Sequence, residues 1–182
     1  MKEIYIIVGR TGAGKSTLCK KLSEYFNYPL LSFAGMGKKF ANLNGYNRIR
    51  DCYLGMGLYE FKIGLSEYFI NIIKDQMKMN DKIIIDGLYI DILLELLKES
   101  WRCKIIYIKT EDIIRYERVS ERLSCTLEQA RIENETKERI KNELGIDKFF
   151  TNADNIVDGN KTMNEVFLTT KQFIENSQIT NT

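Results

Sequence analysis

The chain has 182 residues, of which 44% are hydrophobic and 29% charged, a composition typical of a soluble globular protein with one domain. Its net charge of +2 gives no overall field favouring nucleic acid or an anionic membrane, so we expect neither as a partner. The chain contains no histidine, which excludes the commonest general base and the commonest transition-metal ligand. Any chemistry must therefore use carboxylates, lysine, arginine and a hard cation.

The four cysteines are far apart in the sequence, and none forms a C-x-x-C pair. This spacing argues against a zinc site or a redox pair and is consistent with free thiols in a reducing compartment. The first apolar run is short and leads into a glycine-rich turn, so it does not resemble a signal peptide. No stretch approaches the ~20 apolar residues that cross a bilayer. We expect a cytoplasmic protein, and both a monomer and a homodimer remain open.

The first predicted element is a buried strand over residues 3–8, a β-branched apolar run without a break. Residues 9–17 follow with the sequence Gly-Arg-Thr-Gly-Ala-Gly-Lys-Ser-Thr, which fits the phosphate-binding pattern G-x-x-x-x-G-K-[ST]. Apolar residues at helical spacing come next, over residues 18–26. Strand, glycine loop and helix thus occur in the order that the motif requires. The alternative, a chance match in a surface turn, does not account for that order.

Each residue type in this loop has a chemical reason to be there. Glycines allow positive φ and a close approach to a ligand, so that a row of backbone N–H groups can bind oxyanions. We expect the whole loop to bind ATP, through Gly9, Arg10, Thr11, Gly12, Ala13, Gly14, Lys15, Ser16 and Thr17. Lys15 would contact the β- and γ-phosphates as a catalytic residue, and the Ser16 hydroxyl would ligate Mg²⁺.

The stretch between residues 27 and 80 has the weakest pattern of the chain. Residues 30–33 predict a short strand, residues 34–40 a basic glycine-rich loop that enters a short helix, and residues 58–79 a long amphipathic helix. We expect residues 34–80 to form an acceptor-binding insertion. The candidates for gripping an anionic acceptor are Lys38, Arg48 and Arg50, although solvated surface charge explains these residues equally well.

A second buried strand, residues 82–87, places Asp86 at its carboxyl end. Beside a phosphate loop, Asp86 can hold Mg²⁺ or orient an attacking hydroxyl; the alternative is that it caps the next turn. Proteins that activate water for hydrolysis have Glu after this Asp, so Gly87 favours transfer to a bound acceptor over hydrolysis. The chain also lacks the N-K-x-D segment that reads guanine and the Leu-Ser-Gly-Gly signature of transporter ATPases.

The rest of the chain continues to alternate strands and helices. Strands are expected over residues 103–108 and 155–158. Helices are expected to begin at Asp91, Thr110, Thr126 and Thr162, the last two in capping boxes with Gln129 and Glu165. The pattern predicts an α/β protein, a doubly wound three-layer α/β/α fold around a five-stranded parallel sheet.

We assign residues 1–175 to one domain, with a short lid over residues 111–145, and residues 176–182 to a frayed tail. In doubly wound sheets, ligands bind at the carboxyl ends of the strands. Gly9, Asp86 and Thr110 all fall at such ends. The sequence therefore predicts that three separated segments meet in one crevice.

Three arginines on the helix after the strand over residues 103–108 complete the candidates. Arg115, Arg118 and Arg122 have the spacing i, i+3, i+7 and share one helix face. Like charges at these spacings repel each other, and a polyphosphate bound by planar bidentate donors would offset that repulsion. We therefore expect catalytic arginines that neutralise the transferring group. The alternative is a solvated helix face, since Glu111 and Glu121 lie at pairing spacings.

Together these residues resemble the nucleoside monophosphate kinase family of P-loop kinases. Residues 9–17 are similar to its donor site, and Asp86-Gly87 resembles the Asp-Gly after the third strand of adenylate kinases and related archaeal kinases. The three arginines resemble their lid arginines. Residues 158–161, Asp-Gly-Asn-Lys, resemble the segment whose backbone lies against the donor adenine, which implies that Gly159 and Lys161 bind ATP. Residues 127–131 and 153–158 also look like dephospho-coenzyme A kinase, which shares the fold.

The chain departs from this family on the acceptor side. Adenylate kinases follow their Asp-Gly with a motif that supplies an arginine for the acceptor phosphate, but residues 88–90 here are Leu-Tyr-Ile. Their acceptor helix begins with an acid and then an arginine, where this chain has Gly35 and Lys38. The resemblance implies transfer of the γ-phosphoryl of Mg·ATP to a nucleoside monophosphate or a similar small anionic acceptor. The alternatives are a dephospho-coenzyme A kinase and a nucleotide-binding regulatory NTPase without a small acceptor.

Overall fold

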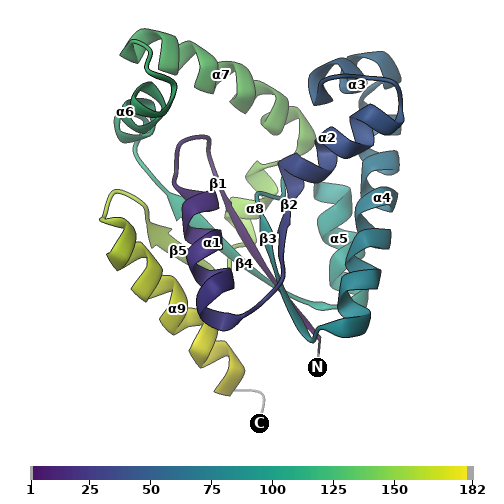
Figure 1. Cartoon of the computed structure of the whole chain (residues 1–182), viewed down its shortest axis with the longest axis vertical. Coiled ribbons are helices and arrows are strands. Elements are labelled where there is room, and N and C mark those ends of the chain that lie inside the picture. The colour runs from purple at the N-terminus through teal and green to yellow at the C-terminus, as the bar shows by residue number, and fades with distance from the viewer. Residues whose placement is uncertain (1, 180–182) are drawn as a thin grey trace.

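The computed structural model describes residues 2–179, which form a parallel five-stranded sheet with helices on both faces (Figure 1). The strand order is β2-β3-β1-β4-β5. The strands are β1 (Glu3–Gly9), β2 (Leu30–Ser32), β3 (Lys82–Asp86), β4 (Arg102–Lys109) and β5 (Asn155–Asp158). The helices are α1 (Lys15–Phe26), α2 (Phe33–Leu43), α3 (Ile49–Met56), α4 (Leu58–Met79), α5 (Asp91–Ser100), α6 (Asp112–Leu123), α7 (Leu127–Leu144), α8 (Asp147–Thr151) and α9 (Met163–Ile179). The predicted doubly wound α/β fold is confirmed.

The central strand β1 is buried along its whole length, which explains its continuous apolar sequence. Its side chains alternate between two hydrophobic cores. Ile4 and Ile6 pack into the core formed with α2, α3, α4 and α5, while Tyr5 and Ile7 pack into the core formed with α1 and α9. The order of the strands reverses around β1, so a crevice opens where β1 ends and the loop to α1 begins.

The helix α7 runs across the top of the view in Figure 1, above the carboxyl ends of the strands. The helix α6 precedes it on one side, and α2 and α3 lie near its other end. The elements that follow β1, β2, β3 and β4 therefore surround the same edge of the sheet. None of the helices within residues 2–179 has the length and apolar character that a membrane span needs.

The segment that was hardest to interpret from sequence, residues 34–57, consists of two helices. The glycine-rich stretch expected to be a loop belongs to α2, because Phe33, Met36 and Phe40 lie on one helix face and are buried in the core. Burial of that face outweighs the low helix propensity of the two glycines in it. Gly37 also allows α3 to approach, since a Cβ there would lie 3.1 Å from Ile49 Cδ1.

Both helix starts expected from capping boxes are confirmed, but the tail differs from the prediction. Thr126 and Gln129 exchange side-chain and backbone hydrogen bonds at the start of α7, and Thr162 and Glu165 do so before α9. The tail predicted to fray from Asn176 is instead helical as far as Ile179. Residues 180–182 lie outside the described residues.

The core between α2 and α4 yields a stability prediction. Phe69 of α4 is fully buried and its ring lies 5.0 Å from that of Phe33. Phe69→Ala should lower the free energy of unfolding by about 3–5 kcal/mol, because it removes apolar contacts and leaves a cavity. Urea denaturation measures this loss. The control is Met79→Ala at the exposed end of the same helix, and equal effects of the two changes would contradict the described packing.

Candidate active site

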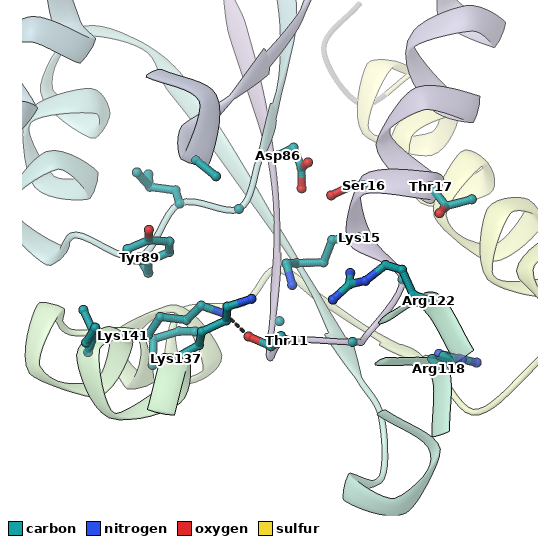
Figure 2. Close-up of a pocket in the computed structure, with 18 of the residues that line it drawn as sticks. Thr11, Lys15, Ser16, Thr17, Asp86, Tyr89, Arg118, Arg122, Lys137 and Lys141 are labelled. Atoms are coloured by element: carbon teal, nitrogen blue, oxygen red, sulfur yellow. Dashed lines mark hydrogen bonds between the residues drawn. The ribbon is translucent and has the colours of Figure 1, made fainter. Parts of the chain in front are cut away.

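A cavity of about 1060 Å³ opens at the carboxyl ends of β1 and β3 (Figure 2). The predicted site residues that line it are Gly9, Thr11, Gly12, Gly14, Lys15, Ser16, Thr17, Arg50, Asp86, Arg118, Arg122 and Lys161. The predicted site residues that do not line it are Arg10, Ala13, Lys38, Arg48, Arg115 and Gly159. Most of the residues predicted for the donor side thus come together in one place.

The phosphate loop is a compact turn whose backbone depends on glycine. The N–H of Ala13 and the Nζ of Lys15 both donate to the carbonyl of Arg10, at 3.2 and 2.8 Å. Gly12 and Gly14 have φ of 84° and 89°, in the left-handed region that favours glycine. The helix α1 begins at Lys15, directly after the loop, so its N-terminus adds partial positive charge at the cavity.

Lys15 lies in an environment that disfavours its charge. Burial, and to a smaller extent the nearby Lys141, lower the pKa of Lys15 to about 7, although Asp86 and Glu138 partly oppose the shift. A bound polyanion would supply the missing counter-charge. Binding of an anion would therefore stabilise the charged form of Lys15.

Asp86 ends β3 beside β1, where it pairs in register with Ile7, and the N–H of Gly87 donates to the Ile7 carbonyl at 2.9 Å. Figure 2 shows the Asp86 carboxylate near the Ser16 hydroxyl. Burial and the charge of Asp86 raise the pKa of the Cys19 thiol well above its usual value, so Cys19 stays protonated.

The oxygen atoms of Ser16 and Asp86 are hard ligands of the kind that Mg²⁺ prefers. The described part of the chain holds no cluster of three metal-binding acids, cysteines or histidines. Mg²⁺ is commonly bound by one or two carboxylates together with substrate phosphates and water. The residues present therefore fit a magnesium ion that binds with a nucleotide.

Basic side chains from several elements face the cavity. They are Arg50 of α3, Arg118 and Arg122 of α6, Lys137 and Lys141 of α7, and Lys161 before α9. The acidic residues that line the cavity are Asp86 and Glu121. Figure 2 shows Arg122 extending toward Lys15. The surplus of positive charge suits a polyanionic ligand.

The cavity has two halves on either side of Lys15. In Figure 2, Thr17, Arg118 and Arg122 lie on one side and Tyr89 and Lys141 on the other. The apolar lining residues are Ala34, Ile49, Leu88, Tyr89, Ile140, Ile146 and Met163, of which Leu88 is next to Tyr89 and Ile140 next to Lys141 in the sequence. Burial raises the pKa of Tyr89 to about 12, and its ring packs edge-on against Phe33 at 4.6 Å. The half near Tyr89 therefore combines apolar walls with cations.

Sequence reasoning missed Lys137 and Lys141 as cavity residues. They are four positions apart on the predicted charged helix, so they share one face. Lys137 also pairs with Glu133 at 2.7 Å, which is the usual pattern of a solvated helix. The i, i+4 spacing was a signal, but only the position of α7 above the sheet shows that this face meets the cavity.

Arg115 does not lie with the other two arginines. It is 3% exposed, donates from Nη1 to the carbonyl of Thr11 at 2.9 Å and pairs with Asp112 at 2.6 Å. The start of α6 lies directly against the loop, since a Cβ on Gly12 would come within 2.6 Å of the Arg115 carbonyl oxygen. Arg115 therefore contacts the loop backbone, and the prediction that it faces a transferring group is not supported by its position.

The other predicted residues outside the cavity have different surroundings. Lys38 and Arg48 are exposed, and Arg48 pairs with Asp51 of its own helix region at 2.7 Å. Gly159 is buried, and its carbonyl accepts from Arg118 Nη2 at 2.9 Å. A Cβ on Gly159 would lie 2.0 Å from Thr110 Oγ1, so glycine is required by packing there.

Comparison with known proteins gives matches over most of the chain. A family model described as an AAA domain matches residues 6–141. An adenylate kinase isoenzyme 6 homolog of Plasmodium falciparum is 30% identical over 156 residues, covering 84% of this chain and 77% of that protein. Among solved structures, an uncharacterized protein from Eubacterium ventriosum (TM-score 0.66, 16% identity, 96% and 99% of the two chains) is similar in fold. Shikimate kinase from Bacteroides thetaiotaomicron is also similar in fold, with a TM-score of 0.64 and 12% identity over 96% of this chain and 98% of that chain. The match to the family model and the identity to the adenylate kinase homolog together show that the chain belongs to the P-loop nucleoside monophosphate kinase-like family.

Proposed function

We propose that this protein transfers the γ-phosphoryl group of Mg·ATP to a nucleoside monophosphate or a similar small anionic acceptor. The observation that carries the proposal is a single cavity in which the phosphate loop and Asp86 lie between two basic halves. One basic half suffices to bind a nucleotide. A second half with its own cations and apolar walls supports a second, acceptor ligand. The identity to an adenylate kinase homolog supports the same reading.

On the donor side, the loop amides and Lys15 would bind the β- and γ-phosphates. Lys161 and Arg118 line the same cavity and would contact the rest of the nucleotide. Ser16 and Asp86 would hold Mg²⁺, which supplies charge neutralisation between the β- and γ-phosphates when it is bound. Arg122 extends toward Lys15 and is placed to neutralise the transferring group. Asp86 can also accept a hydrogen bond from the attacking acceptor oxygen.

On the acceptor side, the arginine that adenylate kinases supply after their Asp-Gly is replaced by Leu88 and Tyr89. The cations that line this half come instead from Arg50 on α3 and from Lys137 and Lys141 on α7. We infer that these residues bind the acceptor anion, while Ile49 and Tyr89 contact its apolar body. Dephospho-coenzyme A also has an anionic group and an adenine ring, so it belongs in the acceptor screen.

The first prediction concerns the reaction itself. ADP release from Mg·ATP should rise by at least ~10³-fold with one acceptor among ribo- and deoxyribonucleoside monophosphates and dephospho-coenzyme A, because transfer needs a positioned acceptor. Lys15→Ala should lower kcat/KM by about 10²–10³-fold, since it removes a preorganised charge on the transferring group. A coupled assay for ADP measures both quantities.

The control is Lys20→Ala, which changes an exposed lysine one turn further along the same helix and should leave turnover unchanged. Mg·ATP binding without stimulation by any of these acceptors would contradict the proposal. That result would favour the regulatory NTPase or an acceptor of another class.

A second prediction separates two neighbouring arginines that the sequence could not distinguish. Arg50 lines the cavity, whereas Arg48 lies outside it and pairs with Asp51. Arg50→Ala should raise the acceptor KM by about 10–100-fold, the loss expected for a charge-assisted hydrogen bond. Arg48→Ala should leave it within about twofold. Equal effects of the two changes on the acceptor KM would exclude Arg50 from the acceptor site.

A third prediction follows from the lowered pKa of Lys15. At pH 8 the free protein mostly carries neutral Lys15, because the pKa is about 7. A bound polyphosphate favours the charged form, so Mg·ATP binding should take up ~0.9 proton at pH 8 and weaken by up to about tenfold per pH unit above 7. ATP itself contributes little, since phosphate groups with a second pKa near ~6 are already ionised.

Calorimetry of Mg·ATP binding in two buffers with different ionisation enthalpies measures this proton uptake. The matched variant is Lys15→Arg, whose guanidinium stays charged at every pH used and should take up no proton. Absence of uptake by the wild-type protein would show that Lys15 is already charged in the free site.

A further inference from the structure

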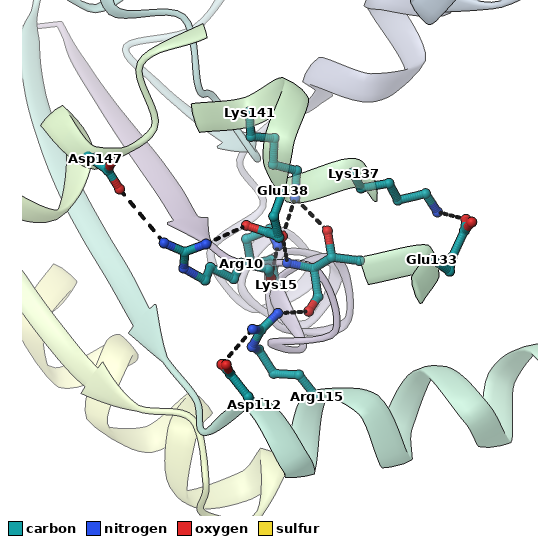
Figure 3. Close-up of polar contacts among 10 residues, drawn as sticks. Arg10, Lys15, Asp112, Arg115, Glu133, Lys137, Glu138, Lys141 and Asp147 are labelled. Atoms are coloured by element: carbon teal, nitrogen blue, oxygen red, sulfur yellow. Dashed lines mark hydrogen bonds and ion pairs between the residues drawn. The ribbon is translucent and has the colours of Figure 1, made fainter. Parts of the chain in front are cut away.

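One residue of the phosphate loop, Thr11, is bonded by three side chains from α6 and α7, those of Arg115, Glu138 and Lys141 (Figure 3). The N–H of Thr11 donates to Glu138 Oε1 at 2.6 Å, and its carbonyl accepts from Arg115 Nη1 at 2.9 Å. The Thr11 hydroxyl accepts from Lys141 Nζ at 2.7 Å. Thr11, Arg115 and Glu138 are 9%, 3% and 6% exposed. Hydrogen bonds to charged partners at such burial are among the stronger ones in proteins.

The side chains around Thr11 form a network of balanced charge. Glu138 contacts Arg10 at 3.2 Å and Lys141 at 3.3 Å. Burial alone would raise the pKa of Glu138, but Lys141 and the Thr11 N–H outweigh it and hold that pKa below its usual value. The cations of the network are Arg10, Arg115 and Lys141, and its carboxylates are Asp112, Glu138 and Asp147. The network can therefore fix the loop backbone without adding net charge to the cavity.

We propose that Glu138 is a positioning residue of the donor site, an inference that rests on the donor half of the proposed function. Thr11, Gly12, Gly14 and Lys15 all line the cavity, but the Thr11 N–H is directed at Glu138 and is not available to a phosphate. By fixing the peptide between Arg10 and Thr11, Glu138 sets the direction of the amides that follow it. The loop cannot relax toward α6, because Gly12 already lies against the Arg115 backbone.

The same contact joins the donor loop to the acceptor side. The helix α7 carries Glu138 between Lys137 and Lys141, both of which line the cavity. The acceptor wall and the phosphate loop are thus positioned by one helix. The alternative is that Glu138 acts as an internal anion that competes with the nucleotide. In that case, loss of its charge would strengthen nucleotide binding.

Calorimetric titration with Mg·ATP tests the inference without an acceptor. Glu138→Gln keeps an oxygen for the Thr11 N–H but loses the charge, and should weaken binding by about three- to tenfold; Glu138→Leu loses both and should weaken it by about 10–100-fold. The matched control is Glu135→Gln on the exposed face of α7, where Glu135 pairs with Arg131 at 2.8 Å. This control should bind Mg·ATP within about twofold of the wild type.

A spectroscopic measurement separates positioning from general stability. In protein labelled with [¹⁵N]threonine, the amide proton of Thr11, assigned with Thr11→Ser, should lie far downfield because its acceptor is a close carboxylate. It should move upfield in Glu138→Gln and stay in place in Glu135→Gln. If Glu138→Leu fails to fold, Glu138→Gln decides.

Equal or tighter Mg·ATP binding by folded Glu138→Gln, or an unmoved Thr11 signal, would overturn the inference while leaving the proposed function intact. Failure of the wild-type protein to bind Mg·ATP would instead overturn the proposed donor site itself, and with it the role of Glu138. The two failures are therefore distinguishable in the same titration.

Discussion

A phosphate loop has to hold backbone N–H groups toward an open cavity, where each of them lacks a protein partner until an anion binds. Such a loop keeps its shape only if the rest of its backbone is bonded elsewhere. Here β1 anchors one end at the centre of the sheet and α1 begins at the other. Between them, Thr11 is held by Arg115 and Glu138, which are 104 and 127 positions away in the sequence. The shape of the phosphate loop therefore depends on the whole fold and not on its motif alone.

The two buried lysines of the cavity differ in how their charges are compensated. Lys15 and Lys141 are both buried enough for their pKa values to be lowered, largely by loss of water. Lys141 is compensated by Glu138, which leaves Lys15 with the least favourable surroundings. A polyphosphate that reaches Lys15 relieves this cost, so part of its binding free energy comes from a site prepared in advance. Lys141 meanwhile stays bonded to Thr11 and also lies over the Tyr89 ring at 5.9 Å.

The sheet, the phosphate loop and Asp86 were predictable because each depends on local sequence: a continuous apolar run, fixed glycine positions, or an acid at a strand end. The roles of the three arginines were not separable, since helical spacing places Arg115 near Arg118 but does not show that the start of α6 lies against Gly12. The short helix expected after a loop over residues 34–40 is longer than predicted, because packing of Phe33 and Phe40 overrides the low propensity of the glycines of α2, and α3 was not predicted. Lys137 and Lys141 look like ordinary surface charge until α7 is placed above the sheet.

The balanced network around Thr11 and the cations at the cavity rim differ in their exposure, and this difference has a consequence for ionic strength. Arg50, Arg122 and Lys161 are exposed, so added salt screens their attraction for a polyanion, with a screening length of about 8 Å at physiological ionic strength. Arg115 and Glu138 are buried, and their bonds to the loop are screened much less. Salt should therefore weaken the capture of nucleotide without loosening the loop that receives it, so the protein would lose affinity at high salt while its donor site keeps its shape.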